Sequence, residues 1–210
     1  PCYSTLADLP ERPEQVIFAI SDQRIEAALD DVIALGIPAC TIFSALILSD
    51  DSTPNLKQRI AIKAQSAGLL IAGANGMGFY NVRDRVLAGG FDTRDHPYPG
   101  NVALISQSGA GMSGIVDCEQ RIQFNFAVSS GYELTVAMED YLDYALDLPE
   151  TRVVGLFLET SRYPEKLIQA FKKANQRNIP IVVLKVGRTD LAAELAISHS
   201  GALAGSDQCY

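Results

Sequence analysis

The stretch that decides the fold is VALISQSGAGMS, residues 102–113. Four apolar residues predict a short buried strand, a Ser-Gln-Ser-Gly turn follows, and small residues then open a helix. A strand that runs through such a turn leaves the first N–H groups of the helix without partners, at the positive end of the helix dipole. The stretch is therefore a candidate site for a phosphate or a carboxylate, with Ser106 and Ser108 as hydroxyl donors and Gly109 allowing close approach. A plain strand-to-helix connection without a ligand is the alternative, and this stretch alone favours neither.

Strands alternate with helices on both sides of this stretch. The other predicted strands are 15–20, 39–45, 69–72, 124–128, 153–158 and 181–186. The predicted helices are 22–35, 55–67, 109–120, 136–146, 164–175 and 190–196. This alternation indicates parallel βαβ units, and the apolar strands indicate sheets that helices cover on both faces. The predicted fold class is therefore α/β.

One segment breaks the alternation. Residues 73–100 show little periodicity, and their tail, HPYPG, is the best candidate for a linker. We place a domain boundary near Pro99, which divides the chain into residues 1–99 and 100–210.

Composition limits the classes of function. The chain of 210 residues is 48% hydrophobic and 20% charged, enough for a sizeable core in one or two domains. Its net charge of −8 argues against nucleic acid or an anionic membrane as the main partner. No run is long enough to span a membrane and no signal peptide is visible, so we expect a cytoplasmic protein. Because the chain begins at Pro1 without an initiator Met, we expect it to be a fragment of a longer protein.

Metal binding is not expected. The 4 cysteines are scattered without a CxxC pair, and only 2 histidines are present. Reduced thiols are therefore the default, and a histidine-based metal site is not predicted.

Polar residues follow several predicted strands at the point where each strand ends. In parallel sheets, ligands bind beyond the carboxyl ends of the strands. In the second half these ends are 106–109, 129–131, 159–161 and 185–188. In the first half, Ser44 and Asn75–Gly76 hold the corresponding positions. We expect the polar ends of the second half to share one edge of the sheet.

His199 and Glu159 are more informative together than separately. Taken alone, His199 is best interpreted as a loop histidine without a role, and Glu159 as a solvated carboxylate. Together they suggest that Glu159 accepts from one imidazole nitrogen and leaves the other as a nucleophile. The carboxylate would also stabilise the cation formed if His199 were phosphorylated, and the helix N-terminus at Ser108–Gly109 could hold the phosphoryl oxygens.

A serine hydrolase is a weaker alternative. Ser108, Glu159 and His199 occur in an order compatible with a catalytic triad. The nucleophile elbow, however, requires glycine two residues before the serine, where this sequence has Ser106. No glycine-rich nucleotide fingerprint is present.

Several segments resemble the NDP-forming acyl-CoA synthetases, relatives of the succinyl-CoA synthetase α subunit. They are NVALISQSGA (101–110), VSSGYELTVAMEDYLDYALDLPETRVVGLFLE (128–159), SHSGALAGSD (198–207) and, at the start, PCYSTLADLPE (1–11). The resemblance implies a truncated Rossmann-like CoA-binding domain in residues 1–99. It also implies a flavodoxin-like, succinyl-CoA synthetase type domain with a parallel sheet in residues 100–210, truncated at its C-terminus.

The resemblance also implies a reaction and its residues. Acyl-CoA, phosphate and NDP would be interconverted with acid, CoA and NTP through an acyl phosphate and a phosphohistidine. His199 would carry the phosphoryl group and Glu159 would orient it. The implied phosphate ligands are Ser106, Ser108, Gly109 and Ala110, and the implied CoA contacts are Ser44, Asn75 and Gly76. The nucleotide, Mg-ATP/ADP or GTP/GDP, would bind to an ATP-grasp domain or a β-type subunit outside this chain. The assembly would be oligomeric, and the fragment alone inactive.

Two motifs of the family are altered. The Pro-Asn-Cys-x-Gly motif appears as residues 74–78 with glycine in place of the cysteine, and the Gly-Asn-x-x-Asp motif appears as residues 131–135 with Tyr132 and Thr135. These changes favour an alternative function, a non-catalytic CoA-binding or regulatory module of a fused acyltransferase-type protein. The retained His199 and Glu159 favour the enzyme, because a sensor needs no nucleophile.

Overall fold

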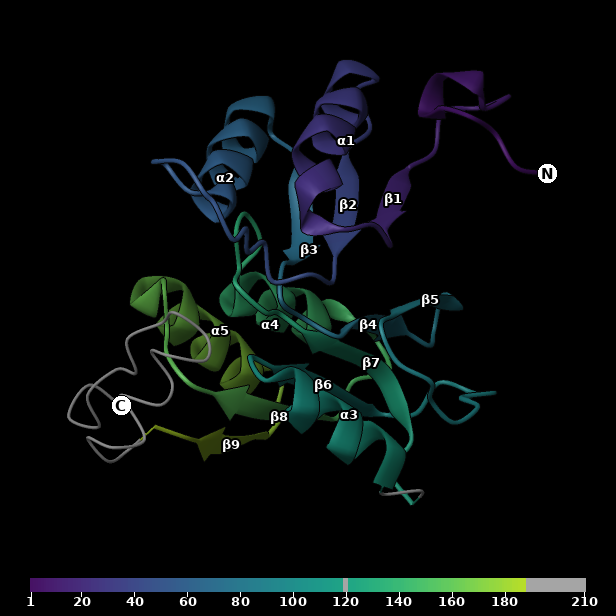
Figure 1. Ribbon diagram of the computed structural model, residues 1–210. Helices are drawn as coiled ribbons and strands as arrows, with labels where there is room; N and C mark the ends of the chain where they lie inside the picture. Colours follow the sequence, from purple (N-terminus) through teal and green to yellow (C-terminus); the bar gives the residue numbers. More distant parts are fainter. Residues whose placement is uncertain (119–120, 188–210) are drawn as a thin grey trace.

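Two β-sheets with their helices make up the molecule, and the carboxyl end of the smaller sheet faces the larger one (Figure 1). The computed structural model describes residues 1–118 and 121–187. The strands are β1 (Gln15–Phe18), β2 (Ala39–Ile42), β3 (Leu70–Gly73), β4 (Gly78–Asn81), β5 (Val86–Gly89), β6 (Val102–Ser106), β7 (Phe124–Ser129), β8 (Val153–Leu158) and β9 (Ile181–Lys185). The α-helices are α1 (Asp22–Ala34), α2 (Leu56–Ala67), α3 (Gly109–Cys118), α4 (Met138–Asp147) and α5 (Pro164–Gln176), and a 3-10 turn covers Leu6–Asp8.

The smaller sheet is parallel, with the order β1-β2-β3. Helices α1 and α2 cover one of its faces, where Phe18, Ile42 and Ile71 join a single apolar core. On the opposite face Ile17 is 47% exposed and Leu70 is 54% exposed. The expectation that helices cover both faces is therefore wrong for this sheet within the described residues.

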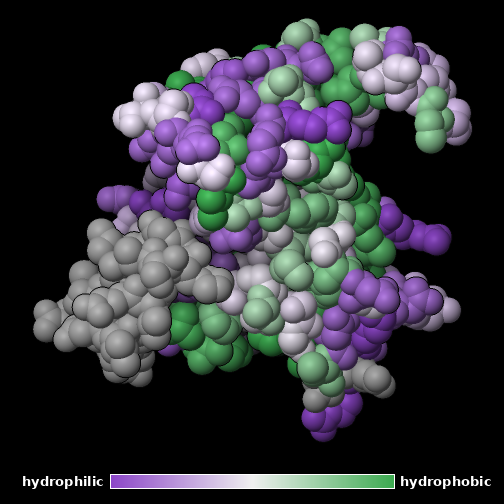
Figure 2. Space-filling model, viewed as in Figure 1, coloured by the Kyte–Doolittle hydropathy of each residue, from purple (hydrophilic) through white to green (hydrophobic). Residues whose placement is uncertain are grey.

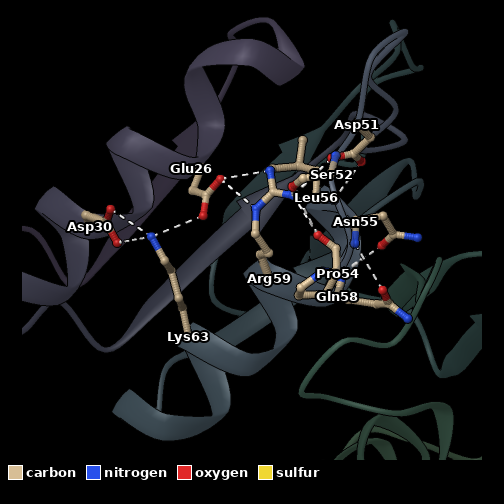
Figure 3. Close-up of polar contacts among 10 residues, drawn as sticks. All are labelled: Glu26, Asp30, Asp51, Ser52, Pro54, Asn55, Leu56, Gln58, Arg59 and Lys63. Carbon is tan, nitrogen blue, oxygen red and sulfur yellow. Dashed lines mark hydrogen bonds and ion pairs between the residues drawn. The ribbon is translucent and has the colours of Figure 1, made fainter.

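Charged side chains fasten α1, α2 and the loop after β2 to one another (Figure 3). The guanidinium of Arg59 lies 3.0 Å from Glu26 and 2.9 Å from Asp51, and Lys63 joins Glu26 to Asp30. A hydrogen bond from the amide of Leu56, followed by one from Arg59, lowers the pKa of Asp51. These contacts hold the loop whose first residues approach the strand ends of the larger sheet.

The larger sheet has the order β5-β4-β7-β6-β8-β9. Strands β6 to β9 run parallel to one another, whereas β4 is antiparallel to both of its neighbours. Helix α3 lies on one face and α4 and α5 on the other (Figure 1). Side chains of β6 alternate between these faces, since Ala103 and Ile105 join the core of α4 and α5 while Leu104 joins that of α3.

The hairpin β4–β5 lies in residues 73–100, the segment with little periodicity in which the sequence predicts no strand. Each strand is only four residues long, too short to show a period in the sequence. Pairing with β7 holds β4 in the larger sheet, and its Tyr80 is buried there. The hairpin precedes the predicted boundary near Pro99, yet it belongs to the sheet of the second half.

The remaining predicted elements are found within a few residues of their expected bounds, β2 being the main exception because it ends at Ile42 rather than residue 45. The predicted helix 190–196 lies outside the described residues. Val182 and Leu184 of β9 are 64% and 55% exposed. Figure 2 shows hydrophobic surface in the part of the molecule where Figure 1 draws β8 and β9. Within the described part of the chain, no helix is both long and apolar enough to cross a membrane.

Candidate functional site

A cavity of about 240 Å³ lies where the strand ends of the two sheets meet. The loops after β2, β3, β6, β7 and β8 all contribute to its wall. Its lining residues are Phe43, Asn75, Gly76, Met77, Gln107, Ser108, Gly109, Ala110, Gly131, Tyr132 and Glu159. The structure thus gathers the predicted phosphate turn, the predicted carboxylate and two of the predicted CoA contacts around one space.

Close backbone packing joins the two sheets at this cavity. The amide of Tyr132 donates to the carbonyl of Ala74 at 2.7 Å, and the amide of Leu134 donates to that of Gly73 at 3.4 Å. Gly131 has a φ of +60°, and a Cβ there would lie 2.1 Å from the carbonyl oxygen of Ala74. Only glycine allows this approach, so Gly131 brings Asn75 and Gly76 to the larger sheet.

The N-terminus of α3 forms one wall. Gly109 and Ala110, the first two residues of the helix, line the cavity, and amides in a first turn have no partner within the helix. The hydroxyl of Ser108 accepts from the amide of Gly111 at 3.1 Å and so caps α3. This contact leaves the hydroxyl hydrogen of Ser108 available to a ligand. The wall therefore offers two amides and one hydroxyl to an anion.

Ser106 does not take the place expected for it. Its side chain is fully buried, and it is absent from the wall of the cavity. The hydroxyl donates to the carbonyl of Ser108 at 2.7 Å and accepts from the amide of Ser108 at 3.2 Å. The prediction that Ser106 donates to a bound phosphate is therefore wrong for this structure, because its hydroxyl hydrogen is used within the turn.

Glu159 forms another wall, directly after β8. The amide oxygen of Gln107 accepts from the backbone amides of Glu159 at 2.7 Å and Thr160 at 2.9 Å. The ammonium of Lys185 donates to the carbonyl of Glu159 at 3.0 Å. His199 lies outside the described residues, so its distance to Glu159 stays a prediction.

Glu133 is a buried carboxylate behind this wall. Its side chain is 1% exposed and pairs with Arg162 at 2.9 Å. One oxygen also accepts from Gln107 at 2.9 Å, Ser130 at 2.7 Å and the amide of Met138 at 3.2 Å. Burial raises the pKa of Glu133, while the hydrogen bonds and the positive charge of Arg162 act in the opposite direction.

The predicted CoA contacts are only partly brought together. Asn75 and Gly76 line the cavity, but Ser44 does not. The carbonyl of Ser44 accepts from the amide of Asn75 at 2.8 Å, and its own hydroxyl is buried without a hydrogen-bond partner among the described residues. Ser44 therefore supports the loop after β3 from behind.

The two altered motif positions have defined contacts. Tyr132 lines the cavity, and the ammonium of Lys57 lies 4.3 Å from the centre of its ring. The hydroxyl of Thr135 accepts from the amide of Ile71 at 2.7 Å. Thr135, in the loop after β7 of the larger sheet, is thus hydrogen-bonded to β3 of the smaller sheet.

Sequence reasoning missed several wall residues and the buried carboxylate. Phe43 and Met77 carried no signal, because nothing local shows which loops will meet. Gln107 lies in the predicted polar strand end 106–109, but no role for its side chain followed from the sequence. Glu133 could have been found from the spacing Ser130-x-x-Glu133, which matches the pattern of a hydroxyl and a carboxylate that bond across a turn. Among residues 1–118 and 121–187, no three His, Cys, Asp or Glu side chains gather in a way that could hold a metal ion.

Several known proteins with similar sequences are named as CoA ligases. Residues 99–210 match the family model described as a succinyl-CoA ligase-like flavodoxin domain. The ADP-forming acetate–CoA ligase of Methanocaldococcus jannaschii is 28% identical over 211 residues, covering 100% of this chain and 29% of that protein. The α subunit of ADP-forming acetate–CoA ligase II of Pyrococcus furiosus is 26% identical over 212 residues, covering 99% of this chain and 45% of that subunit.

A solved structure agrees with the same grouping. Acetyl-coenzyme A synthetase 1 of Ca. Korarchaeum cryptofilum, described as dinucleotide forming and solved with phosphate and ADP, has a TM-score of 0.84 and is 27% identical. The match covers 100% of this chain and 45% of that one. The chain thus spans less than half the length of these three relatives.

Proposed function

Because the chain belongs to the family of the succinyl-CoA ligase-like flavodoxin domain, we propose that it is part of an NDP-forming acyl-CoA synthetase. Such an enzyme interconverts acyl-CoA, phosphate and NDP with acid, CoA and NTP. The observation that carries the proposal is the single cavity lined by the N-terminus of α3, by Glu159 and by Asn75–Gly76. A helix N-terminus suited to phosphoryl oxygens, the carboxylate expected to orient His199 and the loop expected to meet CoA share one space.

The amides of Gly109 and Ala110 bind the phosphoryl oxygens in this proposal. They lie at the positive end of α3, and negative charge is stabilised there. The hydroxyl of Ser108 adds a third donor. Because these donors are held in place by the capped turn, they need no rearrangement as charge develops on the phosphoryl group.

His199 is the nucleophile that takes the phosphoryl group from the acyl phosphate. A bond forms between phosphorus and one imidazole nitrogen, and the bond between phosphorus and the acyl oxygen breaks, releasing the carboxylate with the bonding electrons. Glu159 accepts a hydrogen bond from the other imidazole nitrogen and stabilises the resulting positive charge. An oxygen of NDP then takes the phosphoryl group from phosphohistidine, which restores the free imidazole and gives NTP.

Asn75 and Gly76 contact the thiol end of CoA, whose thiol carries the acyl group as a thioester. The fit rests on their place in the wall of the cavity that Ser108, Gly109 and Ala110 also line. The nucleotide, with its magnesium ion, binds to an ATP-grasp domain or β-type subunit outside this chain. The acyl-CoA, phosphate and nucleotide substrates and an oligomeric, cytoplasmic assembly belong to the same proposal.

The test follows phosphohistidine formation in the full-length protein with its nucleotide-binding partner. After incubation with NTP labelled at the γ-phosphate, wild type should carry acid-labile label and His199→Ala should carry none. Glu159→Gln should be labelled more slowly, because the neutral amide stabilises the imidazolium less. Glu165→Gln removes an exposed carboxylate from the first turn of α5 and serves as the matched control. Label that persists in His199→Ala would refute the role of His199.

A regulatory module is the second candidate, and Tyr132 and Thr135 favour it. Tyr132 places an aromatic ring in the wall where the family pattern has asparagine. In this case the full-length protein binds CoA in equilibrium dialysis but neither wild type nor Tyr132→Asn acquires acid-labile label. Labelled wild type excludes a purely regulatory role.

A further inference from the structure

We infer that Gln107 is a positioning residue that fixes the backbone carrying Glu159. The inference rests on the proposed function, because the orientation of Glu159 matters only if the carboxylate acts on His199. Nothing in the sequence pattern of the turn assigned a role to this side chain. Its contacts do so, because they join the loops after β7 and β8.

The amide of Gln107 has its full set of partners. Its oxygen accepts from the amides of Glu159 and Thr160, at 2.7 and 2.9 Å. Its nitrogen donates to the carboxylate of Glu133 at 2.9 Å and to the carbonyl of Thr160 at 2.8 Å. A side-chain amide has two donors and two acceptor positions, and all four are used. The partners also define which end of the amide is oxygen, since both backbone amides can only donate.

The carboxylate of Glu133, which accepts a hydrogen bond from Gln107, is itself held in place by other contacts. Glu133 accepts from Ser130 and from the amide of Met138, and it pairs with Arg162. Because Glu133 is almost fully buried, its hydrogen bonds with Gln107, Ser130 and Met138 lie away from water, where unmade hydrogen bonds are costly. The side-chain nitrogen of Gln107 is therefore held by the fixed carboxylate of Glu133, and its side-chain oxygen holds the loop that carries Glu159.

Arg162, which pairs with Glu133, also contacts the part of the cavity wall formed by Tyr132. The guanidinium of Arg162 donates to the carbonyl of Tyr132 at 2.9 Å. The buried carboxylate of Glu139 accepts from the amides of Arg162 and Tyr163, at 3.1 and 3.2 Å, and so fixes the backbone of Arg162. One network thus sets the positions of Glu159 and Tyr132 relative to α3.

We expect the loss of the Gln107 side-chain amide to slow the transfer of the phosphoryl group. Removing the amide of Gln107 frees two backbone amides at Glu159 and Thr160, so the carboxylate no longer has a fixed place relative to the phosphoryl group. A misplacement of about 1 Å in a reacting constellation costs on the order of 10²-fold in rate. Binding of NTP, which takes place outside this chain, is unaffected.

The experiment compares wild type, Gln107→Leu and Gln107→Glu in the full-length protein with labelled NTP, measuring the rate of acid-labile labelling at saturating NTP. Gln107→Leu should be labelled on the order of 10²-fold more slowly, with the KM for NTP unchanged. The inference would be overturned if Gln107→Leu were labelled at the wild-type rate. It would also be overturned if the slower labelling came from a higher KM for NTP.

Gln107→Glu gives a readout that a merely structural role would not produce. At neutral pH its carboxylate faces the carboxylate of Glu133, and Glu159 and Glu139 add negative charge. The positive charges nearby are those of Arg162, paired with Glu133, and of Lys185, whose ammonium donates to the carbonyl of Glu159. Like charge and burial raise the pKa of such a group, so protonation restores a donor as the pH falls. The labelling rate, divided by that of wild type at each pH, should rise from pH 8 to pH 6 in Gln107→Glu and stay flat in Gln107→Leu. A flat ratio in both variants contradicts the inference.

Asn125→Leu is the matched control. Asn125 is a fully buried amide that donates to Thr151 at 2.7 Å, near the amino end of β7 and so at the opposite edge of the sheet. Asn125→Leu should lower the stability of the fold but keep the wild-type labelling rate. The two proposals fail separately: label that persists in His199→Ala refutes the proposed function. A labelled wild type with an equally fast Gln107→Leu refutes only the role of Gln107.

Discussion

The side chain of Ser106 makes two hydrogen bonds with the backbone of Ser108, donating to its carbonyl at 2.7 Å and accepting from its amide at 3.2 Å. This small ring closes the turn between β6 and α3. Ser108 in turn caps the helix through the amide of Gly111. The direction in which the first amides of α3 point is therefore set by a buried hydroxyl that does not line the cavity.

Ser106→Ala should destabilise the protein because it leaves two backbone groups of the turn without partners. We expect a loss of about 1–2 kcal/mol in the free energy of unfolding, measured by urea denaturation. The control is Ser113→Ala, which removes a hydroxyl bonded to the carbonyl of Ala110 within α3 and should change stability by less than about 0.5 kcal/mol. Equal midpoints for the two variants would show that the ring contributes nothing.

Gly131→Ala should disrupt the joint between the sheets. Its positive φ and the 2.1 Å approach to Ala74 leave no room for a methyl group, so the loop after β3 must move. The loss in unfolding free energy should exceed about 1 kcal/mol. Gly114→Ala is the opposite case, because a Cβ there meets nothing within 4 Å and the position is exposed in α3. It should stabilise by about 0.5–1 kcal/mol, and thermal unfolding of the two variants distinguishes these outcomes.

Arg162→Met should destabilise most at neutral pH. It leaves the buried carboxylate of Glu133 without its positive partner, at a cost of about 1–3 kcal/mol, less than for a fully buried pair because Arg162 is 39% exposed. The pKa of Glu133 is already raised by burial and rises further in the variant. A raised pKa in the folded state favours the protonated form, so the deficit should shrink as the pH falls from 7 toward 5. Urea denaturation at both values gives the comparison, and a deficit that grows in acid would contradict it.

His96 should make the protein less stable in mild acid. Burial, followed by the charge of Arg94, lowers its pKa, while Asp117 and Asp95 act in the opposite direction. A lowered pKa in the folded state means that the unfolded chain binds the proton more tightly, so stability is lost as the pH falls from about 6.5 through the folded pKa.

The variant that tests this is His96→Phe. Both ring nitrogens of His96 are buried and have no hydrogen-bond partner within residues 1–118 and 121–187, and the ring lies 5.8 Å from that of Tyr80. Phenylalanine keeps the ring contact and cannot be protonated. The loss of stability between pH 7.5 and pH 5.5, measured by urea denaturation, should be smaller in His96→Phe than in wild type. The same loss in both proteins would remove His96 as its cause.

Much of the fold follows from local patterns. The strand and turn at residues 102–109 and the helix after Pro164 are found where apolar runs, turn residues and helix-start signals predict them. The α/β class is confirmed, and it follows from the alternation of these elements. The hairpin β4–β5 escapes such reasoning because its short strands are held by β7, more than forty positions away in the chain.

The candidate site likewise combines residues that local patterns predict with residues that only the fold brings to the cavity. Ser108, Gly109, Ala110 and Glu159 could be predicted, since ligands gather at the carboxyl ends of parallel strands. Tyr132 and Asn75 line the same cavity only because two loops bond to each other through Ala74. Whether His199 reaches Glu159 remains a prediction.

The sequence by itself determined which residues stand at strand ends and which turns open helices, because hydrophobic period, glycine and capping residues act over a few positions. Only the tertiary structure decided what those side chains do. It buried Ser106 within its own turn, and it gave Gln107 partners 26 and 53 positions along the chain. Side-chain hydrogen bonds depend on which loops the strand order brings together, and that order is set by the packing of the whole chain.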